Sequence, residues 1–439
     1  MSSANQTPAE SKERMTPYHW TVVILASLGW LFDCMDQRLF VLAREAAVNA
    51  LVGDTVDASL IKTYIGYATT SMILGWATGG IIIGMFSDRY GRVKSLAITL
   101  ILYSLFTGLS GIAQSWNEFM IYRFVAGIGI GGMFGSATTL VAESIPGRFR
   151  PVALGALQTL AALGNIMGSM VSLVIPPSAT ETFIGFEGWR TLFFIGIIPA
   201  LLVAPMLGFL KEPEPWIKMK EDLRKGVTGT KAGSPIEMFR HPTWRKHALI
   251  GLFLGVAGMV GLWGIGFFSP ELISTALEGE PQDKIDRVRA WGTALQDIGS
   301  FLGMAAFTTI ATMLSRRLAF LMSFTLCFVT TVFVFNSLNS ASDAYWMLPI
   351  MGFAQLSLFA GYSIYFPELF PTRLRGTGVG FCYNTVRYLA APAPILLGYL
   401  STLLPFRIAA SIMAGIYIMG IIALIWAPET KGKALPEDD

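Results

Sequence analysis

The sequence predicts an all-α membrane protein with twelve transmembrane helices in two six-helix bundles. Of the 439 residues, 53% are hydrophobic and only 14% are charged, whereas a typical soluble domain carries about 25% charged residues. The apolar residues form blocks of about 20, the length at which a helix crosses a hydrocarbon core about 30 Å thick. A basic, proline-containing segment, 211–246, separates six of these blocks from six others.

The apolar blocks do not alternate between polar and apolar residues, so the strands of a β-barrel are not expected. The predicted spans are 20–41, 64–86, 95–113, 119–141, 153–174, 190–210, 247–268, 291–313, 317–336, 344–366, 377–399 and 406–427. The predicted domains are a disordered cytoplasmic tail (1–17), an N-terminal six-helix bundle (18–210), a cytoplasmic linker (211–246), a C-terminal six-helix bundle (247–427) and a cytoplasmic tail (428–439).

The distribution of basic residues predicts the orientation of the chain. Lysine and arginine occur in both tails and in the linker, whereas the loops 114–118 and 337–343 contain neither. Cytoplasmic loops carry an excess of basic residues, so both termini are expected in the cytoplasm. A polar tail of about 18 residues precedes the first span, so a cleavable signal peptide is not expected. The predicted location is the plasma membrane, as a multi-pass protein of a bacterial inner membrane.

Residues that support enzyme chemistry are scarce. Cys34, Cys327 and Cys382 all fall within predicted spans, and their spacing fits neither a disulfide framework nor a metal site. The three histidines lie at the cytoplasmic edges of spans, where they cannot relay protons through the membrane interior. No nucleophile–base pair and no metal cluster is recognisable, so the protein is not expected to be an enzyme.

A short charged turn joins the second and third spans: Gly84-Met-Phe-Ser-Asp88-Arg89-Tyr-Gly91-Arg92-Val-Lys94. So short a turn makes the two spans antiparallel neighbours. We expect Gly84 to let another backbone approach and Gly91 to adopt the positive φ of a sharp reversal. The basic residues lie where lipid headgroups would be, but Asp88 is a lone acid among bases and needs a partner.

Acids and bases recur at equivalent cytoplasmic points of the two halves. Lipid headgroups would call for bases but not for these acids, so we predict a salt-bridged gate between the two bundles. Exposed pairs contribute only about 0–1 kcal/mol each, which suits a gate that opens and closes. Thr312 stands where the second half would repeat Asp88, so the gate is expected to be asymmetric. Its predicted residues are Asp88, Arg89, Arg92, Glu143, Arg148, Arg150, Glu368, Arg373 and Arg375.

Charged residues within the spans require a reason, because an ionised group in the bilayer core costs about 2.5–3.5 kcal/mol. Asp33 and Asp36 lie on one face of the first span. The rise of about 1.5 Å per residue places Arg123 of the fourth span near the depth of Asp36. We predict that Asp36 and Arg123 pair and control proton coupling, with Asp33 one turn deeper. A static ion pair, an Asp36 facing a water-filled vestibule, or pairing with Arg38 instead of Arg123 remain alternatives.

Arg387 lies midway along the eleventh span, where its planar guanidinium could bind a substrate carboxylate. Its alternative role is a structural pair with Asp297 of the eighth span. Several amide side chains within other spans could add hydrogen bonds, and Trp263, Trp76 and Tyr383 could add apolar or stacking surface. The predicted substrate-binding residues are Arg387, Asn384, Gln158, Asn165, Gln355, Gln296, Asp297 and Trp263.

The charged turn, placed between the second and third spans, resembles the signature loop of the major facilitator superfamily. Arg123-Phe-Val-Ala-Gly127-Ile-Gly129 resembles the fourth-span motif of that family. Pro428-Glu429-Thr-Lys-Gly432 is similar to the segment that ends the second half of sugar porters. Tyr365-Phe-Pro-Glu368-Leu-Phe-Pro371-Thr-Arg373-Leu-Arg375-Gly376-Thr-Gly378 is similar to the pattern of metabolite:proton symporters.

Two features separate the branches of this family. Phe32-Asp33-Cys-Met-Asp36 resembles the F-D-x-x-D of aromatic-acid and sialate symporters. The seventh span lacks the paired glutamines and the asparagine of sugar porters. The resemblance therefore implies alternating access and proton-coupled symport of a small organic anion. It also implies that the paired aspartates and the arginines of the fourth and eleventh spans serve coupling and carboxylate binding.

Other functional classes are distinguishable. A sugar or polyol facilitator or symporter would use Gln158 and Gln355 to bind hydroxyl groups, and its transport could be independent of pH. A non-transporting sensor would need an added soluble domain, for which the tails of about 18 and 12 residues leave no room. The expected partners are a small, anionic organic substrate and the lipid bilayer, with no nucleic acid, no metal and no cofactor other than the coupling proton. The protein is expected to be a monomer.

Overall fold

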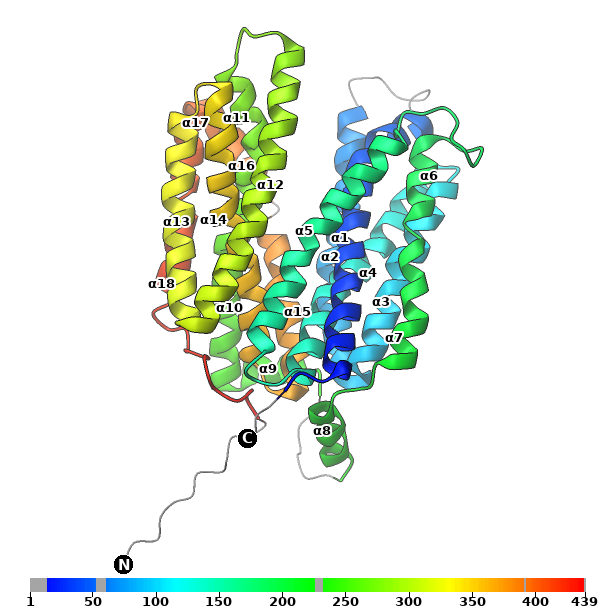
Figure 1. Ribbon diagram of the computed structural model, residues 1–439, viewed down its shortest axis with the longest axis vertical. Helices are drawn as coiled ribbons and strands as arrows, with labels where there is room; N and C mark the ends of the chain where they lie inside the picture. Colours follow the sequence, from blue (N-terminus) through cyan, green and yellow to red (C-terminus); the bar gives the residue numbers. More distant parts are fainter. Residues whose placement is uncertain (1–13, 53–60, 226–231, 391, 438–439) are drawn as a thin grey trace, which may run out of the picture.

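The computed structural model describes residues 14–52, 61–225, 232–390 and 392–437. These residues form helices and connecting segments, and no strand occurs among them. Two bundles of helices stand side by side, α1 to α7 in one and α10 to α18 in the other (Figure 1). The predicted all-α fold is confirmed. Residues 1–13 of the predicted N-terminal tail lie outside the described residues.

The first bundle contains six spans, the last of which is interrupted by a short 3₁₀ helix. Its elements are α1 (Pro17–Val52), α2 (Ile61–Tyr90), α3 (Arg92–Ile112), α4 (Trp116–Ser144), α5 (Arg150–Val174), α6 (Gly188–Ile195), η2 (Ile198–Leu202) and α7 (Val203–Phe209). Two short helices follow in the linker, α8 (Glu214–Arg224) and α9 (Pro235–Arg240). We call the end of the molecule that carries α8 and α9 the linker end.

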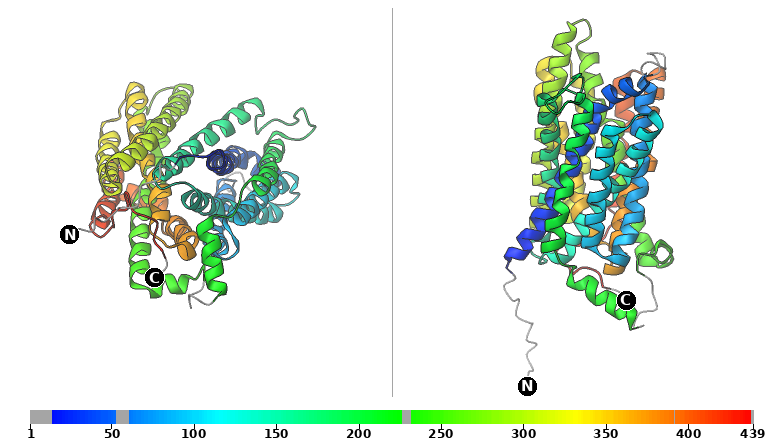
Figure 2. Two further views of the ribbon diagram at one scale, coloured as in Figure 1. Left: turned by 60° about the horizontal axis from the view of Figure 1, so that its bottom comes forward. Right: turned by 90° about the vertical axis from the view of Figure 1, so that its right-hand side faces the viewer.

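The second bundle repeats this plan. Its elements are α10 (Pro242–Gly264), η3 (Gly266–Phe268), α11 (Ser269–Ala276), α12 (Gln282–Met313), α13 (Arg316–Ser337), α14 (Ala341–Glu368), η4 (Thr372–Leu374), α15 (Arg375–Ala390), α16 (Ala393–Leu403), α17 (Phe406–Met413) and α18 (Ile416–Ala423). Two further views show that the linker helices lie at the end where the described chain begins and finishes (Figure 2).

The predicted spans correspond to helices. Within the described residues, ten helical segments are long and apolar enough to cross a membrane. The other two predicted spans, 291–313 and 377–399, correspond to α12 and to α15 with α16. Both are more polar than their neighbours, because α12 carries several charges before residue 298 and α15 carries Arg375 and Arg387.

The turn between α2 and α3 has the predicted geometry. Gly91 is the only residue between the two helices, and its φ of 127° is a conformation that favours glycine. A side chain at Gly91 would also collide with the carboxylate of Glu212. The α2 and α3 helices are therefore antiparallel neighbours, and the charges of this turn face the linker end.

The two bundles meet most closely where α2 packs against α15. Gly80 and Gly84 of α2 face Gly376 and Gly380 of α15, so backbone touches backbone. A Cβ atom at Gly84 would lie 2.5 Å from the carbonyl oxygen of Gly376. The predicted close approach at Gly84 is confirmed, and the neighbouring backbone belongs to the other bundle.

Replacing Gly84 by alanine should therefore separate the bundles at the linker end. The added methyl group meets a backbone carbonyl that cannot rotate away, and overpacking of this kind costs about 1–3 kcal/mol. We expect Gly84→Ala to lower the Tm of the purified protein by several degrees. Gly208→Ala is the matched control, because Gly208 is also helical and has nothing within 4 Å of an added Cβ. An unchanged Tm for Gly84→Ala would show that the two helices do not pack this tightly.

Candidate functional site

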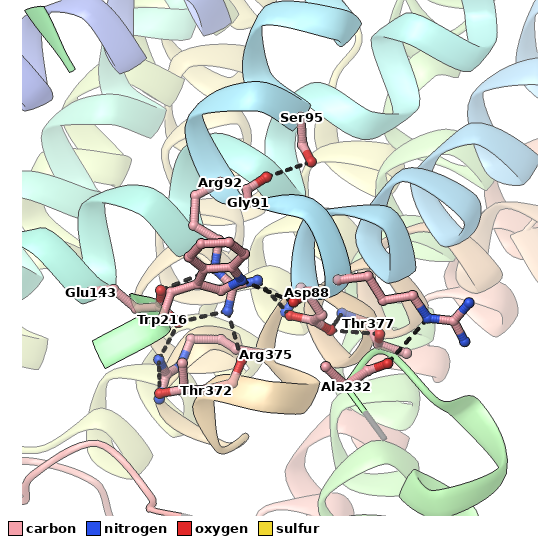
Figure 3. A network of polar contacts seen from close by, with 12 residues as sticks. Asp88, Gly91, Arg92, Ser95, Glu143, Trp216, Ala232, Thr372, Arg375 and Thr377 are labelled. Atoms are coloured by element: carbon pink, nitrogen blue, oxygen red, sulfur yellow. Dashed lines mark hydrogen bonds and ion pairs between the residues drawn. The ribbon is translucent and has the colours of Figure 1, made fainter. Parts of the chain in front are cut away.

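A buried network of charges joins the two bundles at the linker end (Figure 3). Arg92, the first residue of α3, is fully buried. Its guanidinium donates to Asp88 at 2.7 Å, to both carboxylate oxygens of Glu143 at 2.8 and 3.0 Å, and to the carbonyl of Thr372 at 2.6 Å. Arg375 of the second bundle donates to the same Glu143 at 2.5 Å. We call Asp88, Arg92, Glu143, Arg375 and Thr377 the linker-end network.

Asp88 binds the N-terminus of a helix in the opposite bundle. Its two carboxylate oxygens accept the backbone N–H groups of Gly376 at 2.9 Å and Thr377 at 2.8 Å, and the Thr377 hydroxyl at 2.6 Å. The first N–H groups of a helix have no partner within the helix, and the helix dipole favours a negative charge at that end. The lone acid of the turn thus has its partner in α15.

The linker segment contacts the same network. The indole of Trp216 in α8 donates to the backbone carbonyl of Asp88 at 2.9 Å. Arg89 donates to the carbonyls of Ala232 and Gly233, and Arg373 pairs with Glu237 of α9 at 2.7 Å. The sequence did not indicate this role of the linker, although a tryptophan in an otherwise charged segment was a signal for it.

Some predicted gate residues lie elsewhere. Glu368 pairs with Arg316 of its own bundle at 3.0 Å, so it does not link the two bundles in this arrangement. Arg148 is exposed, with its guanidinium over the ring of Phe149. Arg150 begins α5 and is half-buried. Glu368 stays within its own bundle because Arg316 takes the position in the second half that Arg92 takes in the first.

Two acids that end the halves bind helix N-termini within their own bundles. Glu212 accepts the amides of Arg92, Val93 and Lys94, and Glu429 accepts those of Arg316 and Arg317. Partial burial alone would raise the pKa of Glu429, but hydrogen bonds from Ser315 and from nearby backbone amides hold that pKa below its ordinary value. These acids therefore brace each bundle and do not connect the two.

A cavity of about 120 Å³ lies between the bundles, away from the linker end. Three of the predicted substrate-binding residues, Gln158, Asn165 and Asp297, line it. From α1, the sequence analysis proposed only charged residues as functional. The structure shows that Trp30, Cys34 and Gln37 of α1 also line the cavity. The lining residues are Trp30, Cys34, Gln37, Trp76, Gln158, Ala161, Ala162, Asn165, Asp297, Ser300, Met304, Leu356 and Tyr383.

Arg387 lies behind the aromatic wall of this cavity. Its guanidinium stacks on the ring of Trp76 at 3.8 Å and donates to Asn384 and to the carbonyl of Tyr383, both at 2.8 Å. The Nε group of Arg387 has no partner among the described residues. The alternative pairing with Asp297 is not observed, because Asp297 pairs with Arg38. The aromatic contact across the bundles was not predicted.

Asp33 and Arg387 come from different bundles, Asp33 from α1 and Arg387 from α15. The two are close enough for an electrostatic interaction, although they form no ion pair. Asp33 is fully buried; one of its oxygens accepts from Gln37 at 3.0 Å, and the other has no hydrogen bond within the described part of the chain. A buried carboxylate and a buried guanidinium with unfilled hydrogen-bonding positions therefore lie beside one cavity.

The predicted ion pair between Asp36 and Arg123 is not formed. Arg123 is buried against the rings of Phe40 and Phe193, and it donates to Ser110 at 2.9 Å and to the carbonyl of Phe106. Among the described residues, none gives the Asp36 oxygens a hydrogen bond or an ion pair. Asp36 and Arg123 still interact electrostatically, as their similar depths suggested.

Arg38 does not replace Arg123 as the partner of Asp36 either. It crosses α5 at Gly168, where a Cβ atom would lie 2.8 Å from its side chain, and reaches Asp297 of α12 at 3.4 Å. This contact links the two bundles between the cavity and the far end of the molecule. Both side chains are partly exposed, so the pair is weak.

The remaining predicted residues lie around the cavity rather than in its wall. Trp263 of α10 contacts Trp76 edge to face, with ring centroids 6.0 Å apart. Gln355 donates to Thr331 of α13, and Gln296 packs against Gly352 of α14. These two amides therefore connect helices of the second bundle.

Comparisons of the sequence and of the structure with known proteins all find transporters. Residues 39–393 match the model of the Major Facilitator Superfamily. A putative metabolite transport protein of Haemophilus influenzae is 29% identical over 96% of this chain and 99% of its own. A cis,cis-muconate transport protein of Acinetobacter baylyi is 27% identical over 96% of this chain and 97% of its own. The solved structure of the proton:xylose symporter XylE superposes with a TM-score of 0.78 at 20% identity, covering 95% of this chain and 98% of that one.

The linker-end network yields a test on Asp88. We expect Asp88→Asn to loosen the start of α15, because it removes the charge that binds both Arg92 and the helix N-terminus. Breaking a buried pair costs about 3 kcal/mol or more, which corresponds to roughly a hundredfold faster hydrogen exchange of the amides near residue 376.

The control is Thr312→Val, at the corresponding place of the second half. The α5 helix packs against α12 as α15 packs against α2. Because the Thr312 hydroxyl donates only to Thr308 of its own helix, hydrogen exchange of the α5 amides should not change in this variant. Mass spectrometry of deuterated peptides measures the hydrogen exchange of the amides near residue 376 and of the α5 amides. Equal exchange rates in Asp88→Asn and wild type would contradict the role assigned to Asp88.

Proposed function

Because the chain belongs to the Major Facilitator Superfamily, we propose that it is a proton-coupled symporter that carries a small organic anion by alternating access. It is a multi-pass membrane transporter and not an enzyme, as its relatives are transporters. The observation that carries the finer proposal is the buried Arg387, which keeps an unfilled donor beside an interbundle cavity and opposite Asp33.

The substrate carboxylate binds Arg387. A guanidinium offers several donors in one plane and suits a carboxylate better than a point charge does. Trp76 lies on one face of that guanidinium and also lines the cavity, so it presents an apolar surface to the body of the substrate. A flat, unsaturated acid fits this combination, and the similarity to a cis,cis-muconate transport protein supports the same class.

The proton binds the aspartates of α1. Asp36 is fully buried and accepts no hydrogen bond from the described residues, and Arg123 acts on it electrostatically without pairing. Ionisable residues within membrane helices commonly serve as proton relays. Movement of α4 relative to α1 changes the separation of Arg123 and Asp36, and with it the affinity for the proton. Asp33 connects this site to Arg387.

The linker-end network is the inner gate. It is closed in this structure, where Asp88 and Glu143 hold the start of α15. Rocking of the bundles opens it and closes the opposite end, where Arg38 and Asp297 already meet. We assign the linker end and both termini to the cytoplasm of a bacterial cell, and we propose that a monomer is sufficient for transport.

A sugar symporter is the second candidate. The fold neighbour XylE is a proton:xylose symporter, and Gln158 and Asn165 offer amide groups to the cavity. Gln355, the other predicted hydroxyl-binding residue, is instead bonded to Thr331. An uncharged sugar also needs no buried arginine in its binding site, whereas Arg387 is buried and stacked on Trp76. We therefore favour the anion.

The coupling role is tested by Asp36→Asn in proteoliposomes. An amide cannot release a proton, so we expect accumulation of cis,cis-muconate driven by a pH gradient to fall to background. Exchange of external for internal substrate should remain measurable, because it needs no net proton movement. Asp222→Asn on α8 removes an acid outside the bundles and should leave both activities unchanged. Wild-type accumulation by Asp36→Asn would refute proton coupling through this residue.

The binding role is tested by Arg387→Lys, which keeps the positive charge but loses the planar set of donors. We expect KM for cis,cis-muconate to rise about tenfold or more, since a charge-assisted hydrogen bond contributes about 1.5–3 kcal/mol. Arg224→Lys, on the exposed face of α8, is the control. A thermal-shift comparison of muconate, benzoate and xylose at two pH values identifies the substrate class. Stabilisation by xylose alone, at both pH values, would overturn the anion proposal in favour of a sugar.

A further inference from the structure

A groove of about 590 Å³ runs along the second bundle between α10 and α18, outside the transport cavity. Its α10 wall has the spacing of one helix face, and so has its α18 wall. The groove begins at the linker end, where α10 starts. Its lining residues are Pro242, Arg245, Lys246, Leu249, Ile250, Phe253, Met419, Ile422, Ala423 and Trp426.

The charges of this groove lie at one end. Arg245 and Lys246 are both exposed, and neither side chain forms an ion pair or hydrogen bond with a described residue. By contrast, Arg316 and Arg373, at the same end of the second bundle, are both bound to glutamates. Two adjacent cations are therefore available to an anion from outside the protein.

The rest of the groove is apolar. Leu249, Phe253 and Ile422 are all exposed, which in a soluble protein would be unfavourable. From Pro242 to Phe253 the helix rises about 16 Å, close to half the thickness of a hydrocarbon core of about 30 Å. Trp426 is also exposed and lies at the charged end, where tryptophan commonly marks the membrane interface.

From these observations we propose that the groove between α10 and α18 is a binding site for an anionic phospholipid. The lipid phosphate binds Arg245 and Lys246, and an acyl chain lies along Leu249, Phe253 and Ile422. Basic pockets between membrane helices bind anionic headgroups in this way. A zwitterionic lipid would leave the two cations without a net counter-charge.

The site has a structural consequence for the bundle that carries Arg387. The α10 helix packs against α18 on one side and against α15 on the other. A lipid bound between α10 and α18 therefore stabilises the packing of α10, and through it the support of α15. The site is independent of the substrate and of proton coupling.

The test compares the full-length protein in nanodiscs of phosphatidylcholine alone with nanodiscs that also contain phosphatidylglycerol. We expect phosphatidylglycerol to raise the Tm of the wild type and to remain bound in native mass spectra. Arg245→Gln combined with Lys246→Gln should abolish the rise in Tm and weaken binding roughly thirtyfold, since two cations near the phosphate are lost. Ile422→Trp, which fills the acyl part of the groove without changing charge, should reduce the rise as well.

The matched control is Lys218→Gln combined with Arg224→Gln on α8, which removes two exposed cations at the same end but outside the groove. It should keep the wild-type response. The proposal is wrong if the Arg245 and Lys246 double variant keeps the rise in Tm, or if the control loses as much as that variant does. An equal rise produced by inorganic phosphate in phosphatidylcholine nanodiscs would also overturn it, because the acyl groove would then be unnecessary.

Discussion

The closed linker end depends on one buried cation, the guanidinium of Arg92. It is removed from water and has two carboxylate partners, Asp88 and Glu143. Burying a single charge would cost several kcal/mol, so each member of this set requires the others. Arg375 completes the set from the second bundle. The pairs of Arg92 lie within the first bundle, whereas Arg375 and the start of α15 come from the other bundle. Part of the network is therefore lost when the bundles separate, which is the reason for proposing it as a gate.

The linker-end network uses an acid that only the first half of the pseudo-symmetric molecule carries. The second half repeats the internal pair as Arg316 with Glu368, and it repeats the helix-end acid as Glu429. Among the described residues, it does not repeat the contact of Asp88 with a helix N-terminus of the other bundle. Thr312 replaces the acid and bonds to its own helix, while Pro151 stands second in α5 where Gly376 stands in α15. Proline has no N–H to offer, so neither partner of that contact is present.

The sequence was sufficient for features that depend on local chemistry. The spans follow from hydrophobic length, and the reversal at Gly91 follows from the need for positive φ. It was insufficient for contacts that depend on side-chain direction. The helix rise gave the depths of Asp36 and Arg123 but not their rotation about the helix axes, so the predicted ion pair did not follow. Pattern alone also could not place Trp76 beneath Arg387, because residues about 300 positions apart meet there only through tertiary packing.

The helices α2 and α15 connect the gate to the cavity. They run antiparallel, and each carries one residue of the gate and one beside the cavity: Asp88 and Trp76 on α2, Arg375 and Arg387 on α15. In both helices these residues are about twelve positions apart, or about 18 Å of helix. The two contacts therefore fall in register, with facing glycines between them.

A rigid pair of helices held at two points has a mechanical consequence. In the proposed mechanism, a carboxylate that binds Arg387 competes with Trp76 for the position of the Arg387 guanidinium. If α15 moves as one body, a shift away from Trp76 also moves Gly376 and Thr377 away from Asp88. We propose on this basis that substrate binding and opening of the linker end are one movement of one helix. The facing glycines bring the two backbones into contact, and the side chains of Thr78 and Tyr388 also meet across this interface.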